Sequence, residues 1–232
     1  MNEIKHNTAV QKIINKTNKK RNKKILNDVI NDFSTNAKIF FKKANANKKY
    51  TIFVSSTCID LDDTRIKIFN AILEDNNIPI GMEFFNSSSK NKIHVMEKLI
   101  QQSDYHIVIL ANRYGSLHTD GRSLTEVEYD YAKIMQVPSY GFIVNDNNWP
   151  ANKSDKNVDD IEKLNQFKEK LNKDKIVRRW DNADHLCSLI KSAINQGKKE
   201  DPRPGWIRWD FPKLINEYTR NQYKIEEMEG TL

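Results

Sequence analysis

The stretch YTIFVSSTCIDLDDTRIKIFNAILEDN, residues 50–76, decides the fold. Its first part, residues 50–56, is rich in β-branched and aromatic side chains and shows no clean alternation, which is typical of a strand buried on both faces. Residues 60–76 predict a helix, with Asp60 as its N-cap because a carboxylate there can accept from free backbone N–H groups. A buried strand followed directly by a helix indicates an α/β protein.

The same alternation continues along the chain. Further strands are expected at 78–85, 105–111, 137–144 and 175–180, and further helices at 91–103, 123–135, 158–172 and 182–195. Strands that alternate with helices imply a parallel sheet covered by helices on both faces. Five strands and right-handed crossovers favour a flavodoxin-like order, in which ligands bind outside the carboxyl ends of the strands.

We expect three regions, of which 49–198 is the α/β domain and 199–232 is a Trp-bearing loop followed by a charged helix. Residues 1–48 are a basic, partly helical N-terminal extension with helical apolar spacing over 25–33. The formal net charge is +7, and residues 1–49 hold 13 Lys/Arg against 3 Asp/Glu. Such an arm can bind nucleic acid, but it lacks the interleaved aromatic residues of a single-strand binder, so we favour a solvated leader.

Several classes of protein do not fit the sequence. Two cysteines give no disulfide framework and are consistent with a reducing cytoplasm. The first 24 residues have no apolar signal region, and no apolar run approaches membrane-spanning length, so we expect a cytoplasmic protein with no membrane partner. The histidines show no metal-ligand spacing, and we expect no metal site.

The loops after the first two expected strands hold candidate binding groups. Ser55, Ser56 and Thr57 follow the first strand and precede a helix. Hydroxyl and N–H groups in that place suit phosphate or ribose oxygens, although plain helix capping explains them equally well. Glu83 and Phe84 end the second strand, where Phe84 can stack on a base or belong to the core.

The loop after the third strand offers a cation. Arg113 and Tyr114 leave that strand just before Gly115 turns the chain. Arg113 can hold a phosphate, or it can form a structural salt bridge with Asp60 or Asp104. No glycine-rich phosphate loop of the Walker or dinucleotide-binding type occurs, so any nucleotide site here is of another kind.

The stretch SLTEVEYDYA, residues 123–132, contains two glutamates that helix geometry separates. Residues three and four positions apart share a helix face. From Glu126 this relation leads to Asp130, on a polar side, so we expect Glu126 to be solvated. From Glu128 it leads to Ala132 beside the core, so we expect Glu128 to be half buried at the rim of the sheet. A carboxylate held there is a better functional candidate than an exposed one, and the alternative is that it serves stability through a hydrogen bond to a loop.

Several stretches in order resemble a family of bacterial TIR-like domains, which often occur on defence-related nucleotide-binding and tetratricopeptide proteins. These stretches are IFVSSTCIDLDDTR (52–65), IPIGMEFF (78–85), SDYHIVILANRYGS (103–116), SLTEVEYDYA (123–132) and PGWIR (204–208). The resemblance covers residues 50–145 in order, PGWIR being typical of the family's C-terminal part, and it implies the same flavodoxin-like, TIR-like fold.

The wider superfamily also contains nucleoside deoxyribosyltransferases, which carry Gly-Thr-x-x-Glu-x-Gly-x-Ala with Glu as the nucleophile. Thr125, Glu128 and Ala132 fall on the Thr, Glu and Ala positions, whereas Leu124 and Asp130 replace the glycines. TIR enzymes keep one glutamate on the corresponding helix and use it on the ribose of NAD. The resemblance therefore implies that Glu128 is the catalytic carboxylate.

One carboxylate suits NAD better than a neutral nucleoside, because nicotinamide leaves from a pyridinium that needs no added proton. We see only Glu83 and Asp104 as guesses for a second acid. We therefore expect an NAD glycohydrolase, with a linear or cyclic product and no cofactor besides its substrate NAD. The resemblance to TIR-like domains implies that it acts in bacterial anti-phage defence. The expected substrate-binding residues are Ser55, Ser56, Thr57, Glu83, Phe84, Arg113, Tyr114, Ser123 and Thr125.

Three alternatives stay open. The protein could be a nucleotide-binding sensor without turnover, or a TIR-type interaction module that docks through residues 25–33 and the Trp-bearing tail. It could also be a nucleoside N-glycosidase or a deoxyribosyltransferase. TIR-type cleavage often depends on self-association, so we expect a homo-oligomer, and a companion defence protein is a further expected partner.

Overall fold

The structure is a computed structural model. It describes residues 48–82, 92–145, 149–173 and 177–207, together with single positions at 23, 24, 27, 31, 35 and 220. The chain divides into two compact units, one formed by Lys49–Trp206 and the other by Met1–Lys48 with Ile207–Leu232. Apart from the single positions, the helices expected near the two ends of the chain lie outside the described residues.

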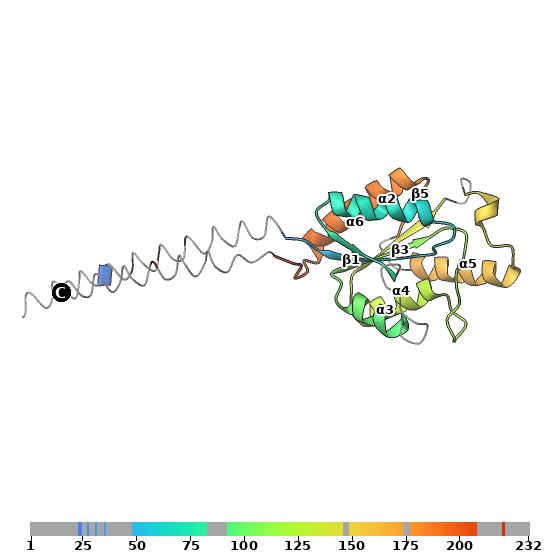
Figure 1. Ribbon diagram of the computed structural model, residues 1–232, viewed down its shortest axis with the longest axis horizontal. Coiled ribbons are helices and arrows are strands. Elements are labelled where there is room, and N and C mark those ends of the chain that lie inside the picture. Colours follow the sequence, from blue (N-terminus) through green and yellow to red (C-terminus); the bar gives the residue numbers. More distant parts are fainter. Residues whose placement is uncertain are drawn as a thin grey trace, which may run out of the picture. The chain divides into compact units, whose positions relative to one another are not determined.

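A five-stranded parallel sheet forms the centre of the first unit (Figure 1). The strands lie in the order β2-β1-β3-β4-β5, which confirms the flavodoxin-like prediction. Their bounds are β1 Thr51–Ser56, β2 Ile78–Ile80, β3 Tyr105–Leu110, β4 Ser139–Val144 and β5 Val177–Trp180. The order changes direction between β1 and β3, and in doubly wound sheets such a switch point opens a crevice at the carboxyl ends.

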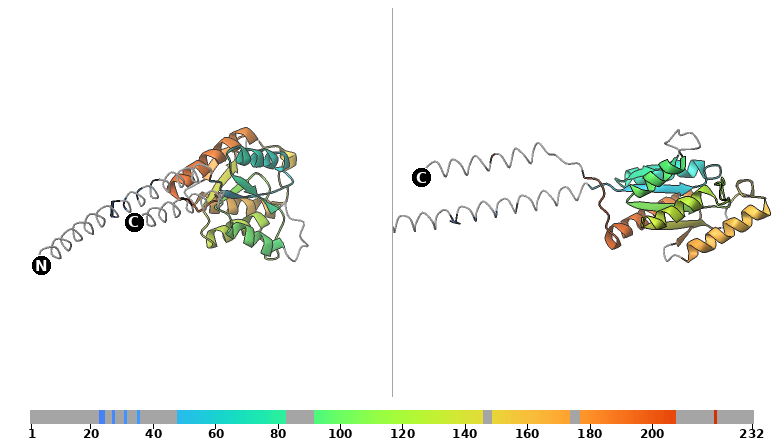
Figure 2. Two further views of the ribbon diagram at one scale, coloured as in Figure 1. Left: turned by 60° about the vertical axis from the view of Figure 1, so that its left-hand side comes forward. Right: turned by 90° about the horizontal axis from the view of Figure 1, so that it is seen from below.

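Helices cover both faces of the sheet (Figures 1 and 2). Helices α2 and α6 pack on one face, and α3, α4 and α5 pack on the other. Their bounds are α2 Asp62–Glu74, α3 Lys92–Gln101, α4 Leu124–Ile134, α5 Val158–Asn172 and α6 Ala183–Glu200, with a short 3-10 turn η3 at Ala151–Lys153. In the described part of the chain, no helix is both long enough and apolar enough to span a membrane.

The central strands are buried on both faces, as their continuous apolar runs predict. Successive strand residues point to opposite sides of a sheet. Ile52 and Val54 of β1 accordingly pack under α2 and α6, whereas Phe53 packs under α3 and α4. This alternation decides which polar residues at the end of each strand can face a ligand.

A chain of hydrogen-bonded polar side chains links β1, β3 and β4. The hydroxyl of Ser139 donates to the carbonyl of Val137 at 3.0 Å, so the same oxygen accepts from His106 Nδ1 at 3.0 Å. His106 Nε2 then accepts from the hydroxyl of Ser55 at 2.8 Å. Burial lowers the pKa of His106 to about 3, so this imidazole is neutral in the folded protein.

The segment after α6 returns to the amino-terminal ends of the central strands β1 and β3. Lys49 and Trp206 exchange two backbone hydrogen bonds, of 2.9 and 2.6 Å. Asp104 accepts from the backbone N–H groups of Thr51 at 2.8 Å and of Gly205 at 2.9 Å. Because these contacts lie at the amino ends of β1 and β3, the guess that Asp104 supplies a second acid is wrong.

The start of α2 differs from the prediction. Leu61 occupies the N-cap position and makes no side-chain capping bond, so Asp60 is not the N-cap. The Asp60 carboxylate instead accepts from the hydroxyl of Thr57 at 2.5 Å, within the turn that joins β1 to α2. The Thr57 hydroxyl is therefore the donor to Asp60, in place of the backbone N–H groups at the start of α2.

Candidate active site

A cavity of about 490 Å³ opens at the carboxyl ends of the strands, within the range of small-molecule sites. It is lined by the loop after β1, by Met82 after β2, and by the loop after β3. The amino-terminal parts of α3 and α4 and the loop before α5 complete the wall. The cavity therefore lies where the fold places ligands, at the switch point between β1 and β3.

Helix α4 carries Glu128 into this wall. The hydroxyl of Ser123 accepts from Glu126 N at 3.1 Å and so caps the helix. Below the cap, a stripe of buried side chains runs along the helix, formed by Thr125, Glu128, Tyr129 and Ala132. Glu128 is only 7% exposed and lines the cavity together with Thr125. Helix spacing thus places a carboxylate at the cavity and keeps it from open solvent.

The hydroxyl loop after β1 forms a second part of the wall. Ser56 and Thr57 line the cavity, and the guanidinium of Arg65 donates to the Ser56 hydroxyl. Arg65 lies one turn into α2, is buried, and has its guanidinium carbon 5.4 Å from the ring centre of Phe69. Sequence reasoning missed Arg65, which lines the cavity from the first part of α2.

Arg113 lines the cavity beside a partner that the sequence did not suggest. Its Nε lies 3.4 Å from a carboxylate oxygen of Asp155, and the other oxygen accepts from the N–H of Tyr114 at 2.6 Å. Asp155, rather than Asp60 or Asp104, is therefore the salt-bridge partner of Arg113. Asp155 belongs to the polar loop before α5, where no pattern in the sequence marks it.

The structure does not bring three of the expected binding residues to the cavity wall. Ser55 points to the opposite side of β1 from Ser56 and bonds to His106, because neighbouring strand residues alternate. Ser123 is fully buried as the cap of α4. Tyr114 packs its ring in the core under α5. Glu83 and Phe84 lie outside the described residues.

Asp60 is a further carboxyl group of the cavity wall, and it is 1% exposed. One of its oxygens accepts from Thr57, and the other, Oδ2, is buried without a hydrogen-bond partner among the described residues. Burial raises the pKa of the Asp60 carboxyl, while the Thr57 hydroxyl, the backbone N–H of Asp60 and the charge of Arg113 oppose part of that rise. The cavity therefore contains two buried carboxyl groups, on α4 and before α2.

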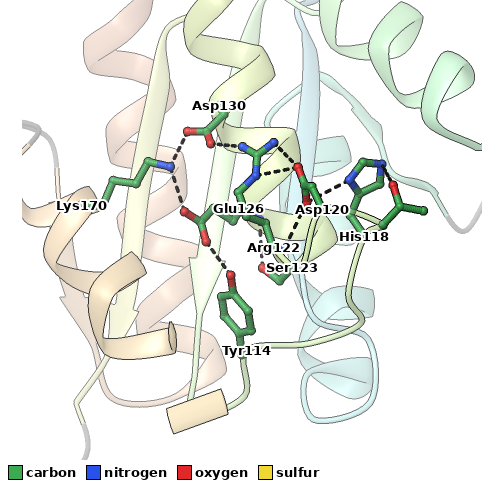
Figure 3. Close-up of polar contacts among 9 residues, drawn as sticks. Tyr114, His118, Asp120, Arg122, Ser123, Glu126, Asp130 and Lys170 are labelled. Atoms are coloured by element: carbon green, nitrogen blue, oxygen red, sulfur yellow. Dashed lines mark hydrogen bonds and ion pairs between the residues drawn. The ribbon is translucent and has the colours of Figure 1, made fainter. Parts of the chain in front are cut away.

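Glu126 belongs to an ion-pair network on the other side of α4, drawn in Figure 3, and is not solvated. One oxygen accepts from the phenol of Tyr114 at 2.8 Å and the other from Lys170 at 2.9 Å. Lys170 also lies 2.6 Å from Asp130, which in turn pairs with Arg122 at 2.6 Å. The expectation of a solvated Glu126 is wrong, because α5 and the loop after β3 pack against that side.

Removing the lysine from this network should weaken the packing of α5 on α4. In Lys170→Met, Glu126 and Asp130 lose their shared cation, and we expect a loss of about 1 kcal/mol in the free energy of unfolding, with a smaller loss in high salt. Urea unfolding at low and high ionic strength measures this. Lys173→Met is the matched control, because that lysine ends the same helix and no ion pair within the described ranges includes it. Equal stability of the two variants would contradict the prediction.

Fold and site together define the class: a doubly wound α/β protein with a buried carboxylate in a cavity at the switch point. Residues 51–195 match the family described as a domain of unknown function (DUF4062), and the chain belongs to this family. No curated protein matches the sequence.

Two solved structures are similar at low identity. One is the 2-desoxiribosyltransferase from Leishmania mexicana, with 14% identity and a TM-score of 0.34 over 41% of this chain and 65% of that one. The other is the translation elongation factor SelB from Methanococcus maripaludis, in complex with the GTP analogue GppNHp. It shows 12% identity and a TM-score of 0.40 over 64% of this chain and 34% of that one. The chain thus spans less than two thirds of either protein, and likenesses this weak carry no functional argument.

Proposed function

We propose that this protein cleaves the N-ribosyl bond of NAD, with Glu128 as the catalytic carboxylate. One observation carries the proposal: a buried glutamate lines a cavity of about 490 Å³ at the switch point of the sheet. In the described residues, the cavity also offers hydroxyl groups and guanidinium groups, which suit ribose and phosphate oxygens. These groups are Ser56, Thr57, Thr125, Arg65 and Arg113.

The chemistry follows from the charge that develops on the sugar. When the bond from C1′ to nicotinamide breaks, its electron pair goes to the pyridinium ring and C1′ becomes positively charged. The Glu128 carboxylate stabilises that charge or bonds to C1′, and water or a group of the same nucleotide then attacks. Water gives a linear product, and an internal group gives a cyclic one.

The resemblance of the sequence to bacterial TIR-like domains supports both the substrate and a role in anti-phage defence. It also favours activity that depends on self-association, so the active form in this proposal is a homo-oligomer. The competing hypothesis is a nucleotide sensor or docking module that uses the same fold without turnover. The place of Glu128 in the cavity wall favours catalysis, because a carboxylate there can reach a ligand bound in the cavity.

The test is nicotinamide release from NAD by the full-length protein at high concentration, with and without a crowding agent. We expect release that rises more steeply than in proportion to protein concentration, because assembly forms the active species. Binding of NAD without nicotinamide release under every condition would overturn the enzyme proposal and favour the sensor. If the protein neither binds NAD nor releases nicotinamide, the docking module is favoured.

A further inference from the structure

Among the carboxyl groups that line the cavity, Asp60 has a buried oxygen for which the described residues supply no hydrogen-bond partner. Asp155 is paired with Arg113 and with the N–H of Tyr114. Asp60 uses Oδ1 to accept from Thr57, and its Oδ2 has no partner in the described part of the chain. A buried polar atom left in this way is costly, so it indicates a ligand atom that completes it.

We propose that Asp60 is a second catalytic carboxyl group, which protonates a leaving base and extends the reaction to nucleosides with an uncharged base. This inference rests on the proposed N-ribosyl cleavage by Glu128. It adds a substrate class that a single carboxylate would not serve, because a neutral purine leaves poorly as an anion.

The hydrogen bonds decide where the proton would lie. Thr57 donates to Oδ1, so a proton on Asp60 belongs on Oδ2, the atom without a partner. Burial raises the pKa of this carboxyl group, which favours the protonated form that a general acid needs. A ring nitrogen of a base bound in the cavity is an acceptor of the required kind.

The charges that face Asp60 agree with a neutral substrate. The charge of Arg113, after β3, lowers the pKa of Asp60, and the charge of Asp155, before α5, raises it. Among the described residues, seven charged side chains line the cavity. The four carboxyl groups belong to Asp60, Glu128, Asp155 and Asp160, and the three cationic groups belong to Arg65, Lys92 and Arg113. With Asp60 protonated, the formal charges of this wall balance, so the cavity has no net charge that would require a charged ligand.

The reaction balances with water as the only co-substrate. The Asp60 proton moves to a base nitrogen, the electron pair of the C1′–N bond goes to the base, and C1′ bonds to the Glu128 carboxylate. Water then attacks C1′, the C1′–oxygen bond to Glu128 breaks, and the water proton returns to the Asp60 carboxylate. The products are the free base and ribose, and both carboxyl groups recover their starting states.

The experiment compares two purine nucleosides that differ in their need for a proton. Guanosine must be protonated to leave, whereas the base of 7-methylguanosine is already cationic. In Asp60→Asn we expect guanine release to fall at least about 100-fold more than release from 7-methylguanosine or from NAD. Wild-type cleavage of guanosine should also weaken as pH rises and Asp60 loses its proton, and the variant should lack this dependence.

Asp63→Asn is the matched control, because it removes an exposed carboxylate three residues away, in the first turn of α2. It should cleave all three substrates like wild type. Retained cleavage of 7-methylguanosine also shows that Asp60→Asn is folded.

The outcomes separate this inference from the proposal beneath it. If wild type cleaves NAD but not guanosine, or if Asp60→Asn slows both nucleosides equally, the role of Asp60 as a proton donor is overturned and Glu128 is unaffected. If wild type cleaves none of the three substrates, the proposed function falls, and this inference falls with it.

Discussion

Replacing Glu128 with glutamine should lower nicotinamide release from NAD at least about 10³-fold, as expected for loss of a group that acts on the reacting carbon. Glutamine keeps the size and the hydrogen-bonding capacity of the side chain but can neither carry a negative charge nor bond to C1′. Because Glu128 is 7% exposed and belongs to the buried stripe of α4, an isosteric change is needed to leave the packing intact. The rate at saturating NAD is the quantity to measure.

Glu126→Gln is the matched control for that experiment. It removes the same charge from the same helix two residues away, but its side chain contacts Tyr114 and Lys170 rather than the cavity. We expect lower thermal stability with a nearly unchanged rate of nicotinamide release. Equal loss of activity in both variants would point to helix α4 as a whole and would remove the specific role of Glu128.

The order of the elements could be predicted from the sequence because each has a strong local signal. Helix α5 was predicted at 158–172 and is observed at Val158–Asn172, with Asn157 capping it through Asp159 N. The bounds of two other elements differ from their predictions. Strand β4 begins at Ser139 rather than at residue 137, and α6 continues to Glu200 rather than stopping at residue 195. A helix stops where its packing partners stop, and local propensity does not show that.

The site was harder to predict because its polar contacts join distant parts of the chain. The partners of Glu126 lie 12 and 44 residues away, and no helical-face argument can see them. Asp155 reaches the site from a loop with no periodic pattern. The separation of Ser55 from Ser56 could have been predicted, since strand alternation allows only one of two neighbours to face a ligand. Glu83 and Phe84 lie outside the described residues, so their roles stay predictions.

The buried imidazole of His106 should make the protein markedly less stable in mild acid. Its pKa is lowered to about 3 by burial in the folded state, against about 6.5 in an unfolded chain. Between these values only the unfolded protein binds the proton. The contribution of the neutral His106 side chain to the free energy of unfolding is therefore complete above pH 6.5. It is lost as pH falls toward 3, at up to about 1.4 kcal/mol per pH unit.

Urea unfolding of wild type and His106→Gln between pH 7.5 and 4.5 measures this contribution. Glutamine can still bond between Ser55 and Ser139 but does not titrate, so we expect the variant to be less stable at pH 7.5 because the bonds fit less well. That deficit should shrink by about 3 kcal/mol at pH 4.5, because the wild type loses that much of its free energy of unfolding between the two pH values. His94→Gln, which removes an exposed imidazole from α3, controls for the loss of any histidine. A constant deficit at every pH would mean that the folded protein accommodates a charged His106, most simply by admitting water to the Ser55–His106–Ser139 chain.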